Sequence, residues 1–487
     1  MVTINMAKQH RASYHFLHCV GSGRLDLALR KDYIDSLQQT QKDIGFTYVR
    51  CHGIFSKNMG IYREYAQSGE IRIVYNFTYL DQIFDQFLKV GIYPLLELGF
   101  MPNELASGPE SVFWWQGNIT PPKKIEQWTA LVTHTLKHLI ERYGAEVVQK
   151  WPIEVWNEPN LTNFWKDADQ AAYFDLYAAT AQAIKAVNPE LQVGGPVISG
   201  GSDYWLRDFL KFVATEQLPL DFLSRHAYSS GPASVNGLVV SQEIMPVQSL
   251  IDDFKTGRAY LEKYYSQQIP VYISEFNTSY TPDNPVHDGA FNAAYLAPLL
   301  SQGSELADSF SYWTFCDMFE EKGIPASFLH GGFGLMTYGQ IKKPTYYLYQ
   351  FFAQLGAEEI YKDANLHVAR GKSGDWVIIG WNADQQLRDI QLTLHMPDDN
   401  KDNKEWFFQR SRVNEHAGNV EAAWKAMGRP RFPSSAELNQ LRELSQPDQE
   451  CGVLCTTDQQ INTVLSLESN EITMIRLQRR STDNQTY

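Results

Sequence analysis

Short apolar runs alternate with amphipathic stretches from about residue 14 to residue 350. This alternation is typical of strand–helix units arranged around a parallel sheet. Eight of the runs have the length and composition of strands, and eight units make a closed (β/α)8 barrel the natural solution. The predicted strands are residues 15–20, 47–52, 93–98, 153–156, 192–195, 221–226, 271–274 and 309–315. The intervening helical spacing predicts helices over residues 31–44, 127–143 and 168–187.

The chain changes character after Lys343-Pro344. Apolar and polar residues then alternate with the period of two that is typical of antiparallel strands, so we expect a C-terminal β-sandwich. Residues 418–446 have helical spacing instead, which indicates a small helical insertion. We therefore expect an α/β chain of three parts: residues 1–13, which join the sandwich, the barrel at 14–345, and the sandwich at 346–487.

Two segments of the predicted barrel share one sequence pattern. Residues 151–160 read WPIEVWNEPN and residues 271–277 read VYISEFN, so each apolar run ends in a glutamate followed by loop-forming residues. Active sites of such barrels lie at the C-terminal ends of the strands, where Glu158 and Glu275 are expected. Hydrolysis of a glycosidic bond requires two carboxylates on either side of the bond. The pair therefore predicts a glycosidase.

The two glutamates need different environments. Glu158 as the catalytic acid must keep its proton at neutral pH, which requires burial or a nearby negative charge. Glu275 as the nucleophile must stay ionised and needs hydrogen-bond donors, for which His226, Tyr228 and Tyr280 are candidates. Glu154 lies deeper along its strand and is predicted to form a buried ion pair in the floor of the barrel.

Other strand ends bring further polar and aromatic residues to the same mouth. Asn157 is suited to bind the sugar 2-hydroxyl, while the ring of Phe113 is consistent with either a pocket wall or the core. Any one of these residues taken singly is more often structural than functional. The strand ends and their loops supply His52, Phe113, Asn157, His226, Tyr228, Tyr280, Trp313, Glu320 and Glu321.

Composition argues against several classes of function. A net charge of −14 argues against nucleic-acid and anionic-membrane partners. No apolar run approaches the ~20 residues of a membrane span, and the first 13 residues lack a signal-peptide core. An odd number of cysteines, five, is expected for reduced thiols and predicts a cytoplasmic location. Two of them form a C-x3-C pair without partner histidines, which gives little support to a metal site.

Several motifs across the whole chain resemble one family, glycoside hydrolase family 39, and within it the β-xylosidases. The family also contains α-L-iduronidases, whose substrate is anionic, and this chain is more similar to the xylosidase branch. The motifs are residues 19–24 (CVGSGR), 48–53 (YVRCHG), 156–161 (WNEPNL), 277–280 (NTSY), 330–334 (HGGFG) and 427–434 (MGRPRFPS).

The resemblance implies a retaining double displacement that releases xylose from the non-reducing end of xylobiose and short xylo-oligosaccharides. By position, Glu158 matches the family's acid/base and Glu275 its nucleophile. No metal or organic cofactor is expected, and a homo-oligomer is left open. The implied sugar-binding residues are His52, Phe113, Asn157, His226, Tyr228, Tyr280, Trp313, Glu320, Glu321 and Phe333.

Two alternatives remain at this point. The same retaining mechanism could act on a β-glucoside or an α-L-arabinoside. A catalytically silent carbohydrate-binding protein could also use this barrel, but it would be expected to lack one of the two carboxylates, and both are present.

Overall fold

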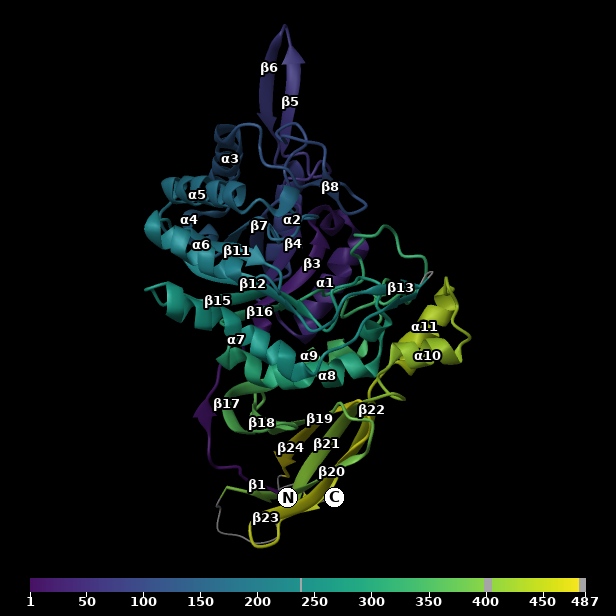
Figure 1. Ribbon diagram of the computed structural model, residues 1–487. Coiled ribbons are helices and arrows are strands. Elements are labelled where there is room, and N and C mark those ends of the chain that lie inside the picture. The colour runs from purple at the N-terminus through teal and green to yellow at the C-terminus, as the bar shows by residue number, and fades with distance from the viewer. Residues whose placement is uncertain (237–238, 398–404, 481–487) are drawn as a thin grey trace.

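A computed structural model of the chain describes residues 1–236, 239–397 and 405–480 (Figure 1). Eight parallel strands close into a barrel in the order β10-β11-β12-β15-β16-β3-β4-β7, as the alternation predicted. The barrel strands are β3 (Cys19–Arg24), β4 (Tyr48–His52), β7 (Tyr93–Leu98), β10 (Pro152–Val155), β11 (Gln192–Ile198), β12 (Phe222–Tyr228), β15 (Val271–Asn277) and β16 (Ser309–Tyr312).

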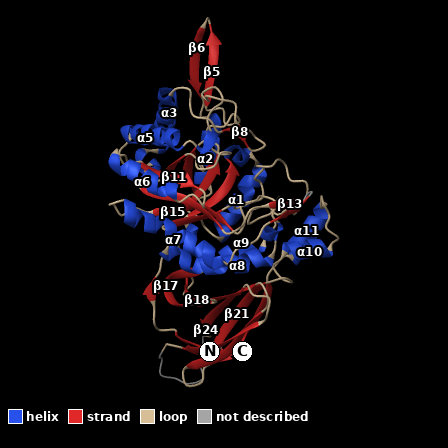
Figure 2. Ribbon diagram, in the orientation of Figure 1, coloured by secondary structure: helices blue, strands red, loops and turns tan. Residues whose placement is uncertain are grey.

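Helices follow the barrel strands and surround them (Figure 2). The three helices predicted at 31–44, 127–143 and 168–187 are confirmed as α1, α3 and α5 within two residues at each end. The helices of the barrel are α1 (Lys31–Asp43), α2 (Thr78–Lys89), α3 (Ile125–Tyr143), α4 (Ala145–Val148), α5 (Gln170–Val187), α6 (Tyr204–Thr215), α7 (Val247–Tyr264), α8 (Ala290–Gln302) and α9 (Pro344–Phe352).

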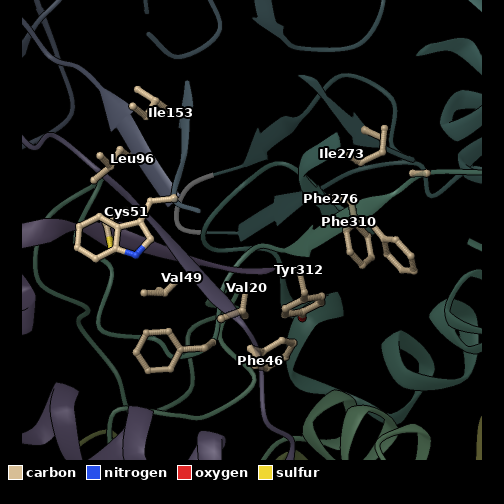
Figure 3. Packing of buried hydrophobic residues seen from close by; sticks show 14 of the residues in the cluster. Val20, Phe46, Val49, Cys51, Leu96, Ile153, Ile273, Phe276, Phe310 and Tyr312 are labelled. Atoms are coloured by element: carbon tan, nitrogen blue, oxygen red, sulfur yellow. The ribbon is translucent and has the colours of Figure 1, made fainter. Parts of the chain in front are cut away.

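The barrel core divides into an apolar outer layer and a polar interior. Figure 3 shows Val49, Leu96, Ile153 and Phe310 among the buried residues that pack between strands and helices. Side chains alternate between the two faces of a strand, so the neighbours of these residues point into the barrel. Among those neighbours are charged residues with no exposed surface, such as Arg50 beside Val49.

The predicted first strand was misplaced. Residues 15–17 form a short 3₁₀ helix, η1 (His15–Leu17), and β3 starts only at Cys19. Phe16 is fully buried among aromatic rings, which holds this turn below the barrel. The strand continues through Gly21 and Gly23, where a Cβ would lie 2.3 Å from the ring of Trp313 and 2.8 Å from the carbonyl of Phe319. Glycines needed for close packing thus made the strand inconspicuous in the sequence.

The C-terminal region forms two sheets around a shared hydrophobic core that includes Ile4, Leu366, Trp376, Leu392 and Leu465. One sheet has the order β1-β20-β23 and the other β2-β17-β18-β19-β24-β21-β22. The strands are β1 (Val2–Asn5), β2 (His10–Arg11), β17 (Leu355–Lys362), β18 (Leu366–Gly371), β19 (Trp376–Asn382), β20 (Arg388–His395), β21 (Glu405–Val413), β22 (Asp448–Cys455), β23 (Gln460–Leu467) and β24 (Glu471–Arg479).

The N-terminal strands β1 and β2 pair with β20 and β17, so the start of the chain lies in the sandwich, as does β24, the last described strand (Figure 1). The expected division of the chain near residue 345 stays a prediction, and the parts of the predicted sandwich at 398–404 and 481–487 lie outside the described residues. Strands β21 and β22 were not predicted, because their exposed faces mix charged, apolar and cysteine residues without a clear alternation.

The predicted helical insertion is present as α10 (Val420–Ala426) and α11 (Ser435–Leu444). It packs through Val420 and Leu441 on Phe328 and Ile341, which belong to the loop after β16. Among the described residues, no helix combines the length and the apolar character needed to cross a membrane. Three two-stranded ribbons also rise from loops: β5 (Tyr62–Gln67) with β6 (Glu70–Tyr75), β8 (Ser111–Val112) with β9 (Gly117–Asn118), and β13 (Ser234–Asn236) with β14 (Val239–Ser241).

Candidate active site

The C-terminal ends of the barrel strands bring most of the expected site residues together. Asn157 and Glu158 follow β10, while Glu275 lies in β15, three strands further around the barrel. The side chains connected directly, or for Asn157 through Arg50, are His52, Asn157, Glu158, His226, Tyr228 and Glu275, and the rings of Phe113 and Trp313 pack against His52.

A buried arginine connects this group to the barrel floor. Arg50, on β4, has no exposed surface and donates hydrogen bonds to Glu154 Oε2 at 2.6 Å and Glu275 Oε1 at 2.6 Å. Its Nη2 donates to Asn157 Oδ1 at 2.8 Å and lies 2.9 Å from Glu97 Oε2. The ion pair predicted for Glu154 is thus confirmed, and Arg50 is its partner.

Sequence reasoning missed Arg50 and Glu97 as parts of the site. Each is a charged residue inside an apolar strand, in YVRCH and YPLLEL respectively, and each is almost completely buried. Burial of an unpaired charge is very costly, so charged residues at inward positions of neighbouring strands indicate a network of pairs. This signal was present in the sequence.

A bulge in β15 turns Glu275 into the barrel. The register between β12 and β15 pairs Arg225 with Ile273 but His226 with Glu275, so Ser274 is an extra residue. As a result both Ile273 and Phe276 belong to the apolar outer layer, although strict alternation would place them on opposite faces. Glu275 then receives hydrogen bonds from Arg50 and from the Tyr228 hydroxyl, which donates to Oε2 at 2.8 Å.

Glu158 is held on the opposite side of the same small space. Its backbone has φ +43°, a left-handed conformation that is uncommon for a residue with a Cβ, and its amide donates to the Val197 carbonyl at 2.9 Å. His226 Nδ1 lies 2.8 Å from Glu158 Oε1 and 3.6 Å from Glu275 Oε2. A carboxylate oxygen of Glu158 and one of Glu275 lie within 4.8 Å of each other.

These surroundings act differently on the pKa values of Glu158 and Glu275. Burial, and next the negative charge of Glu275, raise the pKa of Glu158 well above its usual range. Burial raises the pKa of Glu275 as well, but the Arg50 guanidinium and the Tyr228 hydrogen bond oppose that rise. Two carboxyl groups this close cannot both ionise easily, so a shared proton stays on the one that lacks the arginine. These surroundings favour the proton on Glu158 over the proton on Glu275.

His226 contributes as a neutral ring. Burial, and next the positive charge of Arg50, hold the pKa of His226 well below its usual value of 6.5. The potential ligand atoms of Glu158, His226 and Glu275 are spaced closely enough for a metal ion to bridge them. Arg50 already donates to Glu275 at 2.6 Å, however, and its fixed positive charge disfavours a cation at that carboxylate.

Aromatic rings form the wall beside these groups. The ring centroids of His52 and Phe113 lie 5.8 Å apart and those of His52 and Trp313 4.7 Å apart. Phe333 joins this wall indirectly, because it packs on Phe319, which in turn packs on Trp313.

Of the remaining expected residues, Tyr280 and Glu320 are bound to other groups, while Glu321 faces the site. The Tyr280 hydroxyl accepts from the Ala233 amide at 3.1 Å, and the Tyr280 ring lies 6.5 Å from the ring of Tyr228, whose hydroxyl donates to Glu275. Glu320 pairs with Arg24 at 2.6 Å and Arg30 at 3.0 Å, so its carboxylate is already bound. Glu321 faces the site instead, with Oε1 3.8 Å from His52 Nε2, and burial followed by the charges of Glu275 and Glu158 raises its pKa well above the usual range.

Comparisons with known proteins agree with this geometry. The sequence model of Glycosyl hydrolases family 39 matches residues 1–462. A β-xylosidase of Geobacillus stearothermophilus is 44% identical over 100% of this chain and 97% of that protein. A β-xylosidase of Caldicellulosiruptor saccharolyticus is 33% identical over 92% of both. The crystal structure of a monomeric β-xylosidase from Caulobacter crescentus CB15 superposes with a TM-score of 0.89 at 31% identity, over 98% of this chain and 99% of that one.

The Arg50 network predicts a large stability effect. Arg50→Met should lower the free energy of unfolding by about 3–5 kcal/mol, because it leaves three buried carboxylates without their counter-charge. Arg142→Met, which removes a surface pair with Asp85, should cost only ~0–1 kcal/mol and serves as the control. Urea unfolding measures both variants, and similar losses in the two would contradict a central role for Arg50.

Proposed function

Because the chain belongs to glycosyl hydrolases family 39, we propose that it is a retaining β-D-xylosidase that releases xylose from the non-reducing end of short xylo-oligosaccharides. The observation that carries this proposal is the pair of buried carboxyl groups with oxygens within 4.8 Å of each other. Retaining glycosidases separate their carboxyl groups by ~5–5.5 Å, whereas inverting enzymes need ~6.5–9.5 Å to admit a water molecule. The two β-xylosidase relatives support the choice of sugar.

In the first step, the Glu275 carboxylate attacks the anomeric carbon of the xylosyl unit. The bond to the leaving oxygen breaks as Glu158 gives that oxygen its proton, and a covalent xylosyl–enzyme forms. In the second step, Glu158, now ionised, takes a proton from water, and the hydroxide oxygen attacks the anomeric carbon to displace Glu275. Two inversions leave the product in the β-configuration.

The surrounding residues have supporting roles in this proposal. Because Asn157 Oδ1 accepts from Arg50, its amide N–H groups are left to donate to the sugar 2-hydroxyl, whose hydrogen bond strengthens in the transition state. Tyr228 and Arg50 keep Glu275 ionised and oriented. Glu321 and His52 are positioned to contact other sugar hydroxyls, and Glu320 fixes the loop that carries Glu321 through its two arginines.

We expect the enzyme to act on its substrate inside the cell. The five cysteines are free thiols, two of them exposed, which suits a reducing compartment. The enzyme would then complete xylan degradation by cleaving short imported oligosaccharides, while unbranched polymer should be a poor substrate because the aromatic wall favours a chain end. The alternative of a silent sugar-binding protein has no support from the site, since both carboxyl groups are present and only Glu275 is bound by Arg50 and Tyr228.

Azide rescue tests the two roles. Glu275→Ala should abolish turnover without loss of fold, and azide should restore activity by entering the vacated face and yielding the α-xylosyl azide. Glu158→Ala should still form the xylosyl–enzyme from substrates with good leaving groups, and azide should yield the β-xylosyl azide. Proton NMR identifies the azides and should show β-xylose as the first product of the wild-type enzyme. A β-azide from Glu275→Ala would reverse the assignment.

The pH dependence follows from the mutual effect of the two acids. The negative charge of Glu275 raises the pKa of Glu158, so the protonated, active form of Glu158 persists to higher pH and is lost as pH rises through that pKa. In Glu275→Gln this charge is absent, and the pKa of the Glu158 carboxyl group, followed by 13C NMR without azide, should lie below that of the wild-type enzyme, while burial still holds it above the usual range. An unchanged pKa would mean that Glu275 does not act on Glu158.

Sugar preference should be moderate. Xylose lacks the hydroxymethyl group of glucose. The rings of Phe113, Trp313 and Phe333 are the side chains that could exclude this group sterically. Steric rejection of such a group is worth ~1–3 kcal/mol, so kcat/KM on nitrophenyl β-xyloside should exceed that on the β-glucoside by about 10–200-fold. Some activity on an α-L-arabinoside should remain. A higher kcat/KM on the glucoside would refute the choice of sugar but not the mechanism.

A further inference from the structure

Glu97 on β7 lies closer to a histidine of the site than to Arg50. Its Oε2 is 2.6 Å from His52 Nδ1 and 2.9 Å from Arg50 Nη2. Both Glu97 and His52 are almost completely buried. The register between β4 and β7 pairs Cys51 with Leu96, so the next residues of the two strands, His52 and Glu97, lie side by side on the inner face of the barrel.

The charge of Arg50 does not by itself account for Glu97. The guanidinium donates to Glu154 Oε2 and to Glu275 Oε1, each at 2.6 Å. Glu97 is thus a third carboxyl group beside one positive charge, and the most distant of the three. A buried carboxyl group is costly unless its partners compensate it, so the shorter bond to His52 indicates a second role for Glu97.

The contacts of Glu97 decide which nitrogen of His52 faces it with a hydrogen. Because a guanidinium offers only donors, the Glu97 oxygen beside Arg50 acts as an acceptor, and the hydrogen in its bond to His52 belongs to Nδ1. The His52 ring is also confined, since Phe113 stacks on it and the centroid of the Trp313 ring lies 4.7 Å from its own. The other ring nitrogen, Nε2, is therefore directed into the site.

The Nε2 atom of His52 is left for the substrate. It lies 3.7 Å from Glu275 Oε1 and 3.8 Å from Glu321 Oε1, and both distances exceed that of a hydrogen bond. Within the described ranges, the hydrogen bonds of the His52 ring are limited to the one from Nδ1 to Glu97. A sugar hydroxyl placed between these three atoms can reach each of them.

We propose that Glu97 is a positioning residue that acts through His52. It accepts the Nδ1–H group, sets the orientation of the ring and directs Nε2 at a hydroxyl of the sugar that Glu275 attacks. This role rests on the proposed xylosidase function and deepens it. Glu97 touches no substrate, but it preorganises a group that holds the sugar while the bond is cleaved.

A double-mutant cycle tests whether Glu97 acts through His52. Glu97→Gln keeps the shape of the side chain but removes its charge, and it should lower kcat/KM on nitrophenyl β-xyloside by about 10–100-fold. In the His52→Ala background the same change should cost less than about two-fold, because the ring that Glu97 positions is absent. Losses that simply add in the double variant would overturn the proposal.

Glu154→Gln is the matched control for this cycle. It also removes a buried carboxylate from Arg50, but Glu154 has no contact with His52 in the part of the chain that the structure describes. Its loss of kcat/KM should therefore add to that of His52→Ala within about two-fold. Equal non-additivity in the two cycles would mean that Glu97 acts through Arg50, and would overturn a role specific to His52.

NMR of the histidine ring supplies a signal that a general loss of stability would not move. In the free protein labelled with 15N-histidine, the signal that His52→Ala removes identifies His52 Nδ1–H, which should lie downfield because its bond to a carboxylate is charge-assisted. Glu97→Gln should shift this signal upfield, and Glu154→Gln should leave it in place. An unshifted signal in Glu97→Gln would contradict the proposal.

The wild-type enzyme separates the two levels of the argument. A wild-type chain that does not hydrolyse the xyloside would overturn the proposed function on which this role rests. Additive losses in an active enzyme would overturn the role of Glu97 alone. Circular dichroism of each variant checks that the fold is kept.

Discussion

The contacts of Arg50 connect the floor of the barrel to its active mouth. A guanidinium without exposed surface binds Glu154 and Glu97 below and Glu275 and Asn157 above. Such a buried cation is tolerated only because carboxylates surround it, and the carboxylates are tolerated only because of the cation. The same contacts orient Glu275, the proposed nucleophile, and Asn157, the amide beside the proposed acid, so the structural pairs and the proposed catalytic geometry form one network.

The asymmetry of this network supports the opposite roles proposed for Glu158 and Glu275. Glu275 and Glu158 are both buried, and burial alone raises the pKa of both. Only Glu275 contacts Arg50 and the Tyr228 hydroxyl, whereas Glu158 contacts a histidine that burial keeps neutral. The position of one positive charge on β4 therefore decides which acid loses its proton first.

The sequence was sufficient to predict the barrel, the position of Glu158 and Glu275 at the strand ends and the ion pair of Glu154, because strand periodicity and buried charges can be recognised in the residue order. It could not reveal the bulge at Ser274, since a bulge changes the face of every following residue without changing composition. The first strand was misplaced because Gly21 and Gly23 interrupt its apolar pattern. The sugar contacts expected of Tyr280 and Glu320 stay predictions, and their bonds to Ala233 and to two arginines depend on loop conformations that local sequence does not specify.

The central claim is that Arg50 and the burial of both acids place the single proton on Glu158 and leave Glu275 ionised. Neutron diffraction from deuterium-exchanged crystals of the free protein at neutral pH observes that proton directly. The network predicts a deuteron on the Glu158 carboxyl group, beside His226 Nδ1, and none on Glu275. A deuteron on Glu275, or none on either carboxyl group, would contradict it.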